Sequence, residues 1–313
     1  MISATLYTPD HSQLWDDFVR KSRNATFMHL RGYMDYHHDR FNDGSLILRD
    51  DKGRTIALLP ANISGDTAIS HGGLTYGGLL LGVKTDVMTV IEAMRAIRSF
   101  YRDLGLKKLI YKAIPTIYDR LPAQEDRYAL FLEGAVTTTV NISSTVDLSM
   151  PVEYNENTRR NLRKALNAGI EVRQSDDLTT FHTILSELLD NRYDTRPVHT
   201  LAELQHLSAR FPDNIRLMMA YRNGIPVGGT LLYITDTVTH TQYIAANDEG
   251  KACDALTLLF DTAIDRAHQQ GKRYFDFGTC NEDSGRYLNT GLIRQKNGLG
   301  GRGVIYPAYT LDL

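Results

Sequence analysis

The sequence predicts an α/β (α+β) fold of two similar domains in tandem, each a mixed sheet flanked by helices. The order strand, strand, strand, helix, strand occurs twice along the chain, and a basic helical segment lies between the two copies. A sheet crossed by a helix is the economical way to bury the apolar faces of such elements. We expect the domains to be residues 1–150 and 151–313, and 42% hydrophobic content in 313 residues is enough for two cores.

The first copy begins with the predicted hairpin SLILRDDKGRTIALLPANI (45–63), in which two alternating apolar runs flank the turn residues DDKG. A strand-like, glycine-rich run follows at 68–82. A helix is predicted next, because apolar residues recur at helical spacing in Val87, Ile91, Met94, Ile97 and Tyr101. The helix ends at Gly105, and LKKLIY (106–111) is the strand after it.

The second copy repeats this order. The predicted hairpin IRLMMAYRNGIPVGGTLLYI (215–234) turns at Arg-Asn-Gly, and another strand-like run covers 240–250. The helical apolar residues are Leu256, Leu259, Ala263, Ile264 and Ala267. This helix ends at Gly271, and KRYFDF (272–277) is the following strand. The repeat therefore predicts the same local plan in both domains.

Between the copies, Asn157 or Thr158 is expected to cap a helix that carries four basic residues and stops at Gly169. The strand IEVRQ (170–174) and a second helical region (178–211), interrupted by the loop NRYDTRPVHT, complete this segment. Near the end of the chain, Gly298-x-Gly300-x-x-Gly303 has the letters of a dinucleotide-binding turn. Only ten strand-like residues follow it, so no helix can receive a pyrophosphate there. Its glycines instead predict a close backbone approach or a tight loop.

Composition excludes several function classes. A net charge of −2 and a pI near 6.6 provide no global field for DNA binding. The N-terminus lacks a signal-peptide pattern and no apolar run could span a membrane, so we expect a cytoplasmic protein without a transmembrane segment. Cys253 and Cys280 cannot form a disulfide framework. The adjacent His37 and His38 have no matching ligand pair elsewhere, so no metal site is predicted.

Three segments resemble the FemABX-type branch of the GNAT acyltransferase superfamily: RRNLRKALNAGIEV (159–172), residues 243–278 and the C-terminal run 288–313. The resemblance implies tandem GNAT-like domains, each with a mixed, mostly antiparallel sheet flanked by helices. It also implies transfer of an acyl or aminoacyl group to an amine of a cell-envelope precursor, an amino sugar or a peptide. Acyl-CoA or aminoacyl-tRNA would be the co-substrate, with no cofactor bound permanently, and the acceptor would be a small molecule or a nucleotide sugar.

One alternative stays open. Acetyl-CoA-binding members of the superfamily carry a glycine-rich turn after the fourth strand, whereas NDEGKACDAL (247–256) has one glycine and two neighbouring acids. The chain can therefore also be a binding or assembly protein that keeps the double scaffold without catalysis, since a fold does not establish an activity.

The expected catalytic residues are Lys296 and Asp276. The resemblance places Lys296 where FemABX proteins have a lysine, either to stabilise an oxyanion or the departing carrier, or as a solvated loop residue. Asp276 alternates with Phe275 and Phe277, so it faces a cleft or a partner if both phenylalanines face the core. There it would orient an amine or accept its proton, or else bond backbone amides.

The expected contacts to carrier or acceptor are more widely spread. Like charges at neighbouring helix turns repel, so the basic helix invites an anionic ligand, although nearby acids can neutralise it instead. The forked donors of an arginine before the last strand suit a phosphate or carboxylate, or a surface ion pair. The candidates are Arg159, Arg160, Arg163, Tyr243, Asn247, Asn289, Arg302, His71 and Tyr76.

Overall fold

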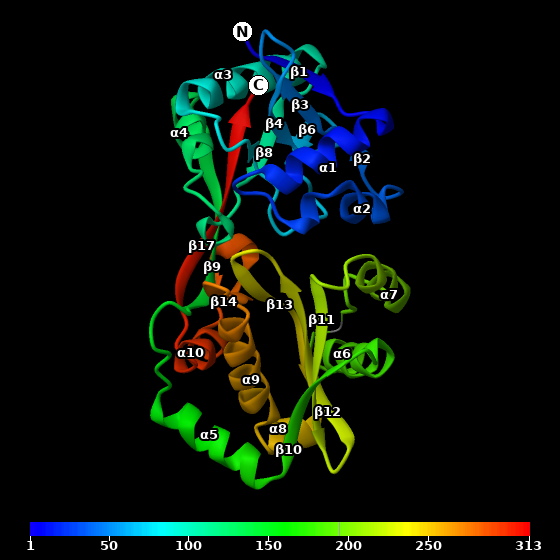
Figure 1. Cartoon of the computed structure of the whole chain (residues 1–313), viewed down its shortest axis with the longest axis vertical. Helices are drawn as coiled ribbons and strands as arrows, with labels where there is room; N and C mark the ends of the chain where they lie inside the picture. Colours follow the sequence, from blue (N-terminus) through cyan, green and yellow to red (C-terminus); the bar gives the residue numbers. More distant parts are fainter. Residues whose placement is uncertain (194) are drawn as a thin grey trace. The chain divides into compact units, whose positions relative to one another are not determined.

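The computed structural model describes residues 1–193 and 195–313. The chain forms two compact units, shown in Figure 1. Unit 1 comprises residues 1–142, 281–287 and 305–313, and unit 2 comprises residues 143–280 and 288–304. Each unit thus combines segments that are far apart in the sequence. Its boundaries differ from those of the two successive domains expected, 1–150 and 151–313.

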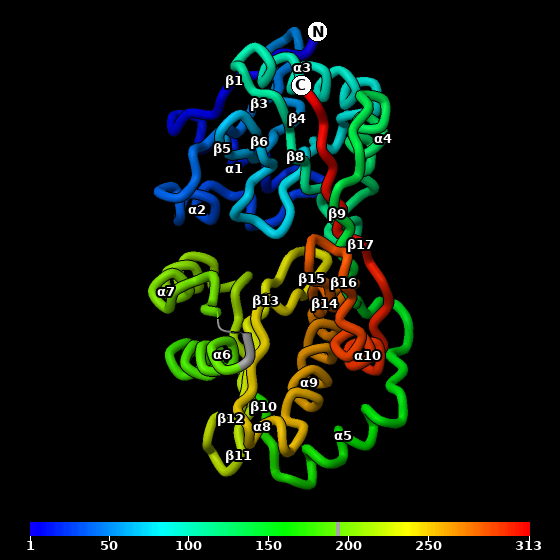
Figure 2. Tube along the Cα trace, turned by 180° about the vertical axis from the view of Figure 1, so that it is seen from behind, coloured from blue at the N-terminus to red at the C-terminus, as the bar shows by residue number. Residues whose placement is uncertain are grey.

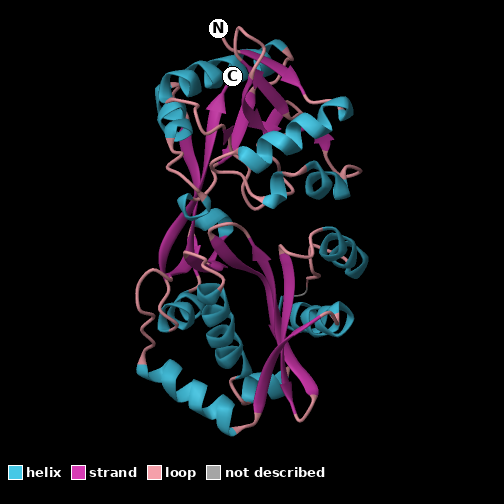
Figure 3. Ribbon diagram, in the orientation of Figure 1, coloured by secondary structure: helices cyan, strands magenta, loops and turns pink. Residues whose placement is uncertain are grey.

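Unit 1 combines short strands with a long helix, α3, and several shorter ones (Figure 3). Its elements up to the shared strand β9 are β1 (Ser3–Leu6), α1 (Ser12–Lys21), α2 (Arg31–Met34), β2 (Asn42–Asp43), β3 (Leu46–Arg49), β4 (Thr55–Leu59), β5 (Asn62–Ser64), β6 (Thr67–Ile69), β7 (Leu80–Leu81), α3 (Val87–Asp103), β8 (Lys108–Lys112) and α4 (Glu125–Leu132).

Unit 2 has longer strands, and its sheet carries helices on both faces: α9 covers one face, and α6 and α7 lie on the other (Figures 1 and 2). The elements from β9 to the C-terminus are β9 (Val136–Asp147), α5 (Glu156–Asn167), β10 (Ile170–Ser175), α6 (Leu178–Tyr193), α7 (Leu201–Arg210), β11 (Ile215–Arg222), β12 (Ile225–Ile234), β13 (Val238–Ala246), α8 (Asp248–Ala252), α9 (Ala255–Gln269), β14 (Tyr274–Thr279), β15 (Asn281–Glu282), β16 (Tyr287–Leu288), α10 (Thr290–Gly298) and β17 (Arg302–Asp312).

The strand order confirms a mixed, mostly antiparallel α/β fold. One sheet of unit 1 has the order β1-β3-β4-β7. The other hydrogen-bonded order is β10-β11-β12-β13-β14-β9-β17-β8-β6-β5-β2. Strands β9 and β17 each have one part in either unit, so the two expected sheets share two strands. Strands β13 and β14 pair in parallel, as do β6 and β8, whereas β10 to β13 pair antiparallel.

The cores form where the amphipathic helices cross the sheets, as their apolar spacing predicts. In unit 1, α3 buries Met94, Ile97 and Tyr101 in a cluster with residues of β3, β4 and β8. In unit 2, α9 packs Phe260 against Phe277 of β14 with ring centroids 5.3 Å apart. The predicted hairpins are β3–β4 and β11–β12, and the second helical region is α6 and α7. Asp194, in the expected loop between these helices, lies outside the described residues.

Two local expectations are wrong. The N-cap of α5 is Asn155, whose side chain accepts a hydrogen bond from the Thr158 amide at 2.8 Å, so neither Asn157 nor Thr158 is the cap. The run 68–82 is not a continuous strand, because β6 ends at Ile69 and β7 covers only Leu80 and Leu81. The chain turns immediately after β6 at His71, which has a left-handed φ of 53°.

Candidate active site

Unit 2 contains a site where its two parallel strands separate. Strands β13 and β14 pair over three positions, the last being His240 opposite Asp276. Gln242 is an extra residue in β13, because Thr241 pairs with Leu232 and Tyr243 pairs with Leu231. Beyond Asp276, the pairing of β14 with β9 is also irregular, and Gly278 has a φ of 76°. Polar side chains from β9, β13 and β14 meet at this point.

Asp276 is the centre of this polar group. Its side chain is fully buried, and its Oδ1 accepts hydrogen bonds from the hydroxyls of Ser143 and Thr145. Its Oδ2 lies 2.7 Å from His240 Nδ1. Burial acts to raise the pKa of Asp276, but the hydrogen bonds from His240, Ser143 and Thr145 outweigh burial and lower it below its ordinary value. Asp276 is therefore an ionised carboxylate, and of the two predicted surroundings, a cleft or a partner, the described residues give it side-chain partners and no open cleft.

His240 is the residue that sequence reasoning missed. An ionised carboxylate can only accept hydrogen bonds, so His240 Nδ1 carries the proton that it donates to Asp276. Nε2 is then the ring nitrogen that can accept a proton, and the side chain is 12% exposed. A buried carboxylate that holds an imidazole in one tautomer is the arrangement by which histidine acts as a general base. The sequence offers one indication, a histidine between two threonines in a strand-like run (Thr239, His240 and Thr241). This pattern does not identify Asp276 as the partner of His240.

Lys296 lies beside the same strand end, on α10. It is 5% exposed, and its Nζ donates to the carbonyl oxygens of Gly278 at 2.8 Å and Thr279 at 3.2 Å. Burial lowers the pKa of the Lys296 ammonium, while Cys280 and Asp276 act in the opposite direction. The interpretation as a solvated loop lysine is therefore wrong. Lys296 and Asp276 are brought together, with Lys296 bound to backbone carbonyls.

The glycines after Lys296 allow a close backbone approach. A Cβ on Gly301 would lie 2.1 Å from Ser144 Oγ, and one on Gly298 would lie 2.8 Å from Thr158 Oγ1. Gly298 is the last residue of α10 and precedes β17, so the glycine-rich motif follows a helix instead of opening one. These glycines let the segment pack against β9 and the start of α5.

Several expected binding residues have structural hydrogen bonds in unit 2. Asn289 is the N-cap of α10 and accepts from the Leu292 amide at 3.0 Å. Asn247 is the N-cap of α8 and accepts from the Gly250 amide at 2.9 Å. The Tyr243 hydroxyl lies 2.6 Å from His199 Nδ1, at the loop before α7. His199 was also missed, because only the fold brings this loop to β13.

The expected arginines are exposed, and the expected residues of unit 1 are buried. Arg159, Arg160 and Arg163 are exposed on α5, and Arg302 is exposed and donates to the Gly301 carbonyl at 2.8 Å. In unit 1, His71 is 5% exposed and Tyr76 is 1% exposed, and the Tyr76 hydroxyl donates to Thr26 Oγ1 at 3.4 Å. The structure thus joins Asp276 with Lys296 and does not add the other candidates to that group.

Amides of the turn after β13 donate hydrogen bonds to acceptors within the same turn. The Gly250 amide donates to the Asn247 side chain, and the amides of Lys251 and Cys253 donate to the carbonyls of Asn247 and Glu249. A Cβ on Gly250 would lie 2.2 Å from the Val227 carbonyl oxygen, so packing against β12 explains this glycine. These three amides are therefore not directed at a phosphate.

Comparisons with known proteins identify the fold. Residues 153–287 match the family model described as "Acetyltransferase (GNAT) domain". The crystal structure of FemX is similar over 99% of this chain and 97% of its own, with a TM-score of 0.71 and 11% identity. The chain has a FemABX-like GNAT fold. This confirms the resemblance seen in the sequence.

Two further solved structures have the same fold. The C-terminal domain of a putative lysylphosphatidylglycerol synthetase from Agrobacterium fabrum matches 95% of this chain and 91% of its own, with a TM-score of 0.60 and 11% identity. A tandem GNAT protein from the clavulanic acid biosynthesis pathway matches 100% of this chain and 98% of its own, with a TM-score of 0.53 and 14% identity. No curated protein matches the sequence. In the described part of the chain, no helix is long and apolar enough to cross a bilayer.

Proposed function

We propose that this FemABX-like GNAT protein is an N-acyltransferase that moves an acyl or aminoacyl group from a carrier to an amine. The observation that carries the proposal is the Asp276–His240 pair, located where β13 and β14 separate inside a GNAT domain. The acceptor would be an amine of a cell-envelope precursor, an amino sugar or a peptide. Acyl-CoA or aminoacyl-tRNA would be the carrier, used as a co-substrate.

The chemistry follows from the geometry of His240. An amine must lose a proton as its nitrogen attacks the carbonyl carbon, and His240 Nε2 accepts that proton. The new N–C bond forms while the C–S or C–O bond to the carrier breaks, and the proton then passes to the departing thiolate or alkoxide. Asp276 holds the imidazole in the required tautomer, and Ser143 and Thr145 hold Asp276.

Lys296 acts as a positioning residue in this proposal. Its ammonium binds the last carbonyls of β14, which lie two and three residues after Asp276, and so holds the strand end that presents Asp276 to His240. Carrier contacts are proposed for Tyr243, Asn247 and Asn289, and the exposed Arg159, Arg160, Arg163 and Arg302 would bind carrier phosphates, although the hydrogen bonds described for these residues are to groups other than the Asp276–His240 pair. The similarity to FemX and to a putative lysylphosphatidylglycerol synthetase domain supports an acceptor in the cell envelope for this proposal.

The test measures transfer from two donors with His240→Gln and the matched control His206→Gln, which changes an exposed histidine of α7. Acetyl-CoA is offered with a panel of amino sugars and peptide amines, and thiol release is followed. Alanyl-tRNA and seryl-tRNA are offered with the same acceptors, and loss of the aminoacyl label is followed. We expect His240→Gln to lower kcat by about 10²–10⁴-fold with little change in KM. His206→Gln should behave as the wild type.

Two outcomes would contradict this proposal. If neither donor is consumed faster than without protein, the binding or assembly protein replaces the enzyme as the better interpretation, and the internally bonded turn 247–256 is the observation that favours it. If transfer occurs and His240→Gln retains the full rate, the base is a different group.

A further inference from the structure

Unit 2 also contains a polar pocket, on the face of its sheet that α9 covers. The cavity measures about 300 Å³ and is lined by residues of β10, β11, β12, β13, α9 and the start of the segment leading into β14. Successive side chains of a strand point to opposite faces, and Thr239 lines this pocket while its neighbour His240 bonds to Asp276. The pocket and the candidate active site therefore lie on opposite faces of β13.

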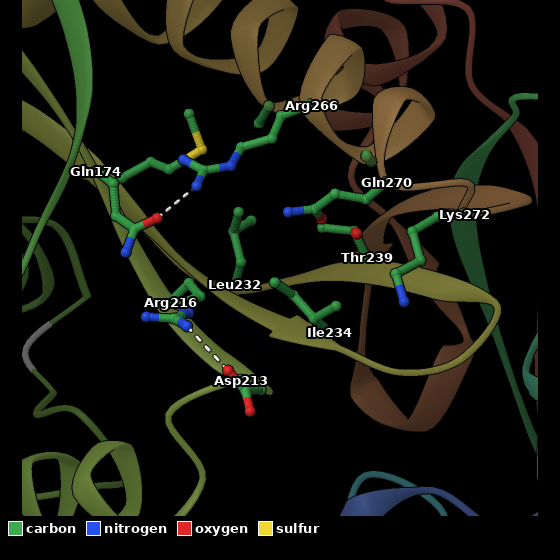
Figure 4. A pocket seen from close by; sticks show the side chains of 12 residues that line it. Gln174, Asp213, Arg216, Leu232, Ile234, Thr239, Arg266, Gln270 and Lys272 are labelled. Carbon is green, nitrogen blue, oxygen red and sulfur yellow. Dashed lines mark hydrogen bonds and ion pairs between the residues drawn. The ribbon is translucent and has the colours of Figure 1, made fainter.

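The pocket wall is positively charged. Arg216, Arg266 and Lys272 line it together with one carboxylate, Asp213 (Figure 4). Arg266 donates to the neutral side-chain oxygen of Gln174 at 2.5 Å, and Lys272 donates to the Thr235 carbonyl at 2.6 Å. These two cations thus have uncharged hydrogen-bond partners, although Asp236 attracts Lys272 from nearby.

The ion pair between Arg216 and Asp213 leaves much of this charge available. The two groups are 3.1 Å apart, but the Asp213 side chain is 92% exposed. An exposed pair of this kind is screened by water and holds its partners weakly. The end of α9 carries partial negative charge, which accounts for a cation such as Arg266. It does not account for Arg216 and Lys272, which come from other segments.

Thr239 adds an independent sign of a missing ligand. The residue is 2% exposed, and its hydroxyl has no hydrogen-bond partner among the described residues. A buried polar group without a partner is costly, and native structures nearly always satisfy it with protein, water or a ligand. In Figure 4 the side chains of Thr239, Gln270 and Lys272 lie on one side of the pocket, opposite Gln174 and Arg266.

The rest of the lining is apolar and limits the ligand. Met218, Leu232, Ile234, Ala263 and Ala267 contribute to the wall between the polar groups. At about 30 Å³ per water molecule, the cavity has room for about ten waters. A ligand of this size with an apolar body and an anionic head would satisfy both parts of the wall.

We propose that this pocket binds a small organic anion, whose carboxylate or phosphate is attracted by the three cations of the wall and pairs with Arg266, while the ligand also reaches the opposite side (Figure 4), where the Thr239 hydroxyl lacks a partner in the described part of the chain. The apolar part of the ligand packs on Leu232 and Ile234. The site is separate from the acyl-transfer chemistry, because His240 and Asp276 lie on the other face of β13.

The test measures binding of benzoate and phenyl phosphate to the full-length protein by titration calorimetry, with inorganic phosphate and phenol as the separated halves. We expect benzoate or phenyl phosphate to bind more tightly than both inorganic phosphate and phenol. Whichever of the two aromatic anions binds more tightly identifies the head group as a carboxylate or a phosphate. Arg266→Gln should weaken that binding by at least about tenfold, as expected for a charge-assisted hydrogen bond. Arg210→Gln removes the same charge from an exposed site on α7 and should leave the affinity unchanged.

Two further variants keep the proposal falsifiable. Thr239→Val keeps the shape of the side chain and should weaken binding by about threefold to tenfold, without lowering the stability of the ligand-free protein. His240→Gln should retain the wild-type affinity, so failure of this proposal and failure of the proposed acyl transfer are distinguishable. Absence of binding at millimolar ligand, or equal affinity in the wild type and Arg266→Gln, would overturn the proposal, as would inorganic phosphate binding as tightly as phenyl phosphate.

Discussion

The two units place different residues at the same point of the same local plan. In both, a hairpin is followed by a long helix and then by a strand that pairs in parallel, β8 with β6 in unit 1 and β14 with β13 in unit 2. The third parallel pair is Ile69 opposite Ile110 in unit 1 and His240 opposite Asp276 in unit 2. One position thus holds two apolar residues in one copy and an acid–base pair in the other. The repeated scaffold does not require the polar pair, so its presence in unit 2 points to function.

Buried ionisable groups also differ between the units. In unit 1, burial lowers the pKa of His29 to about 4 and that of His71 to about 3, so both are neutral when buried. In unit 2, Asp276 is buried as an ion because three hydrogen bonds support its charge. The chain's single tryptophan, Trp15, belongs to unit 1 and is fully buried there. Its fluorescence can therefore report on unit 1 separately.

The largest effect is expected from Asp276→Ala. The change leaves the donors of Ser143, Thr145 and His240 without their acceptor, and removing one partner of a buried polar group costs about 3–5 kcal/mol. The matched change Ile110→Ala in unit 1 removes only apolar contacts of a half-buried side chain and should cost about 1–2 kcal/mol. Urea unfolding followed by hydrogen exchange of residues 143–280 and by Trp15 fluorescence measures the two effects. A loss below about 1 kcal/mol in Asp276→Ala would contradict its role as the shared acceptor of three buried donors.

Acid should destabilise unit 1 before it affects Asp276 in unit 2. Unfolded histidine binds a proton near pH 6.5, whereas folded His29 and His71 bind one only near pH 4 and pH 3. The unfolded state therefore holds more protons below pH 6.5, and stability falls as the pH falls. Each histidine contributes a loss of about 2–3 kcal/mol between pH 6.5 and 4.5. The Trp15 unfolding midpoint measures this loss.

Variants sharpen this pH test. In His71→Asn, the asparagine tolerates the left-handed backbone, and the loss of stability between pH 6.5 and 4.5 should fall by the contribution of one histidine. His38→Asn, on the surface, should leave this loss unchanged. The pKa of Asp276 is depressed, so its contribution to stability is present above its ordinary value of 3.8 and is lost only as the pH falls below it. A Trp15 midpoint that does not change between pH 6.5 and 4.5 would show that these histidines are not held neutral.

The smallest effect should be the same in both units. Gly105 and Gly271 end α3 and α9 with φ values of 87° and 70°, and neither has an atom near the position of a Cβ. Alanine at either position should lower the free energy of unfolding only by the strain of the left-handed backbone, about 1–2 kcal/mol. Asparagine should cost less, because it adopts this conformation more readily. Unfolding of Gly105→Ala and Gly271→Ala, followed with the same two probes, checks this equivalence, and a clearly larger loss at one site would show that the repeat is not preserved there.

Sequence reasoning identified part of the candidate site. Asp276 could be found because it alternates with Phe275 and Phe277, and Lys296 because of the FemABX resemblance. His240 could not be found, because its role depends on a hydrogen bond to a residue 36 positions away. The burial of Lys296 was also beyond the sequence, since the carbonyls that it binds are ordinary backbone groups of Gly278 and Thr279. Every residue has a backbone carbonyl, so residue types do not indicate which carbonyls accept a hydrogen bond.

From the sequence alone, the two hairpins, the helices α3, α5 and α9 and the repeated order of these elements could be predicted, because apolar spacing and glycine ends are local properties. Only the tertiary structure decided which strands are neighbours, and with that the meeting of His240 with Asp276 and of Thr239 with Arg266 around a pocket. It also decided that β17 belongs partly to unit 1. The reason is physical: strand neighbours and register are selected by burial of whole sheet faces under helices, and that burial depends on residues far apart in the chain.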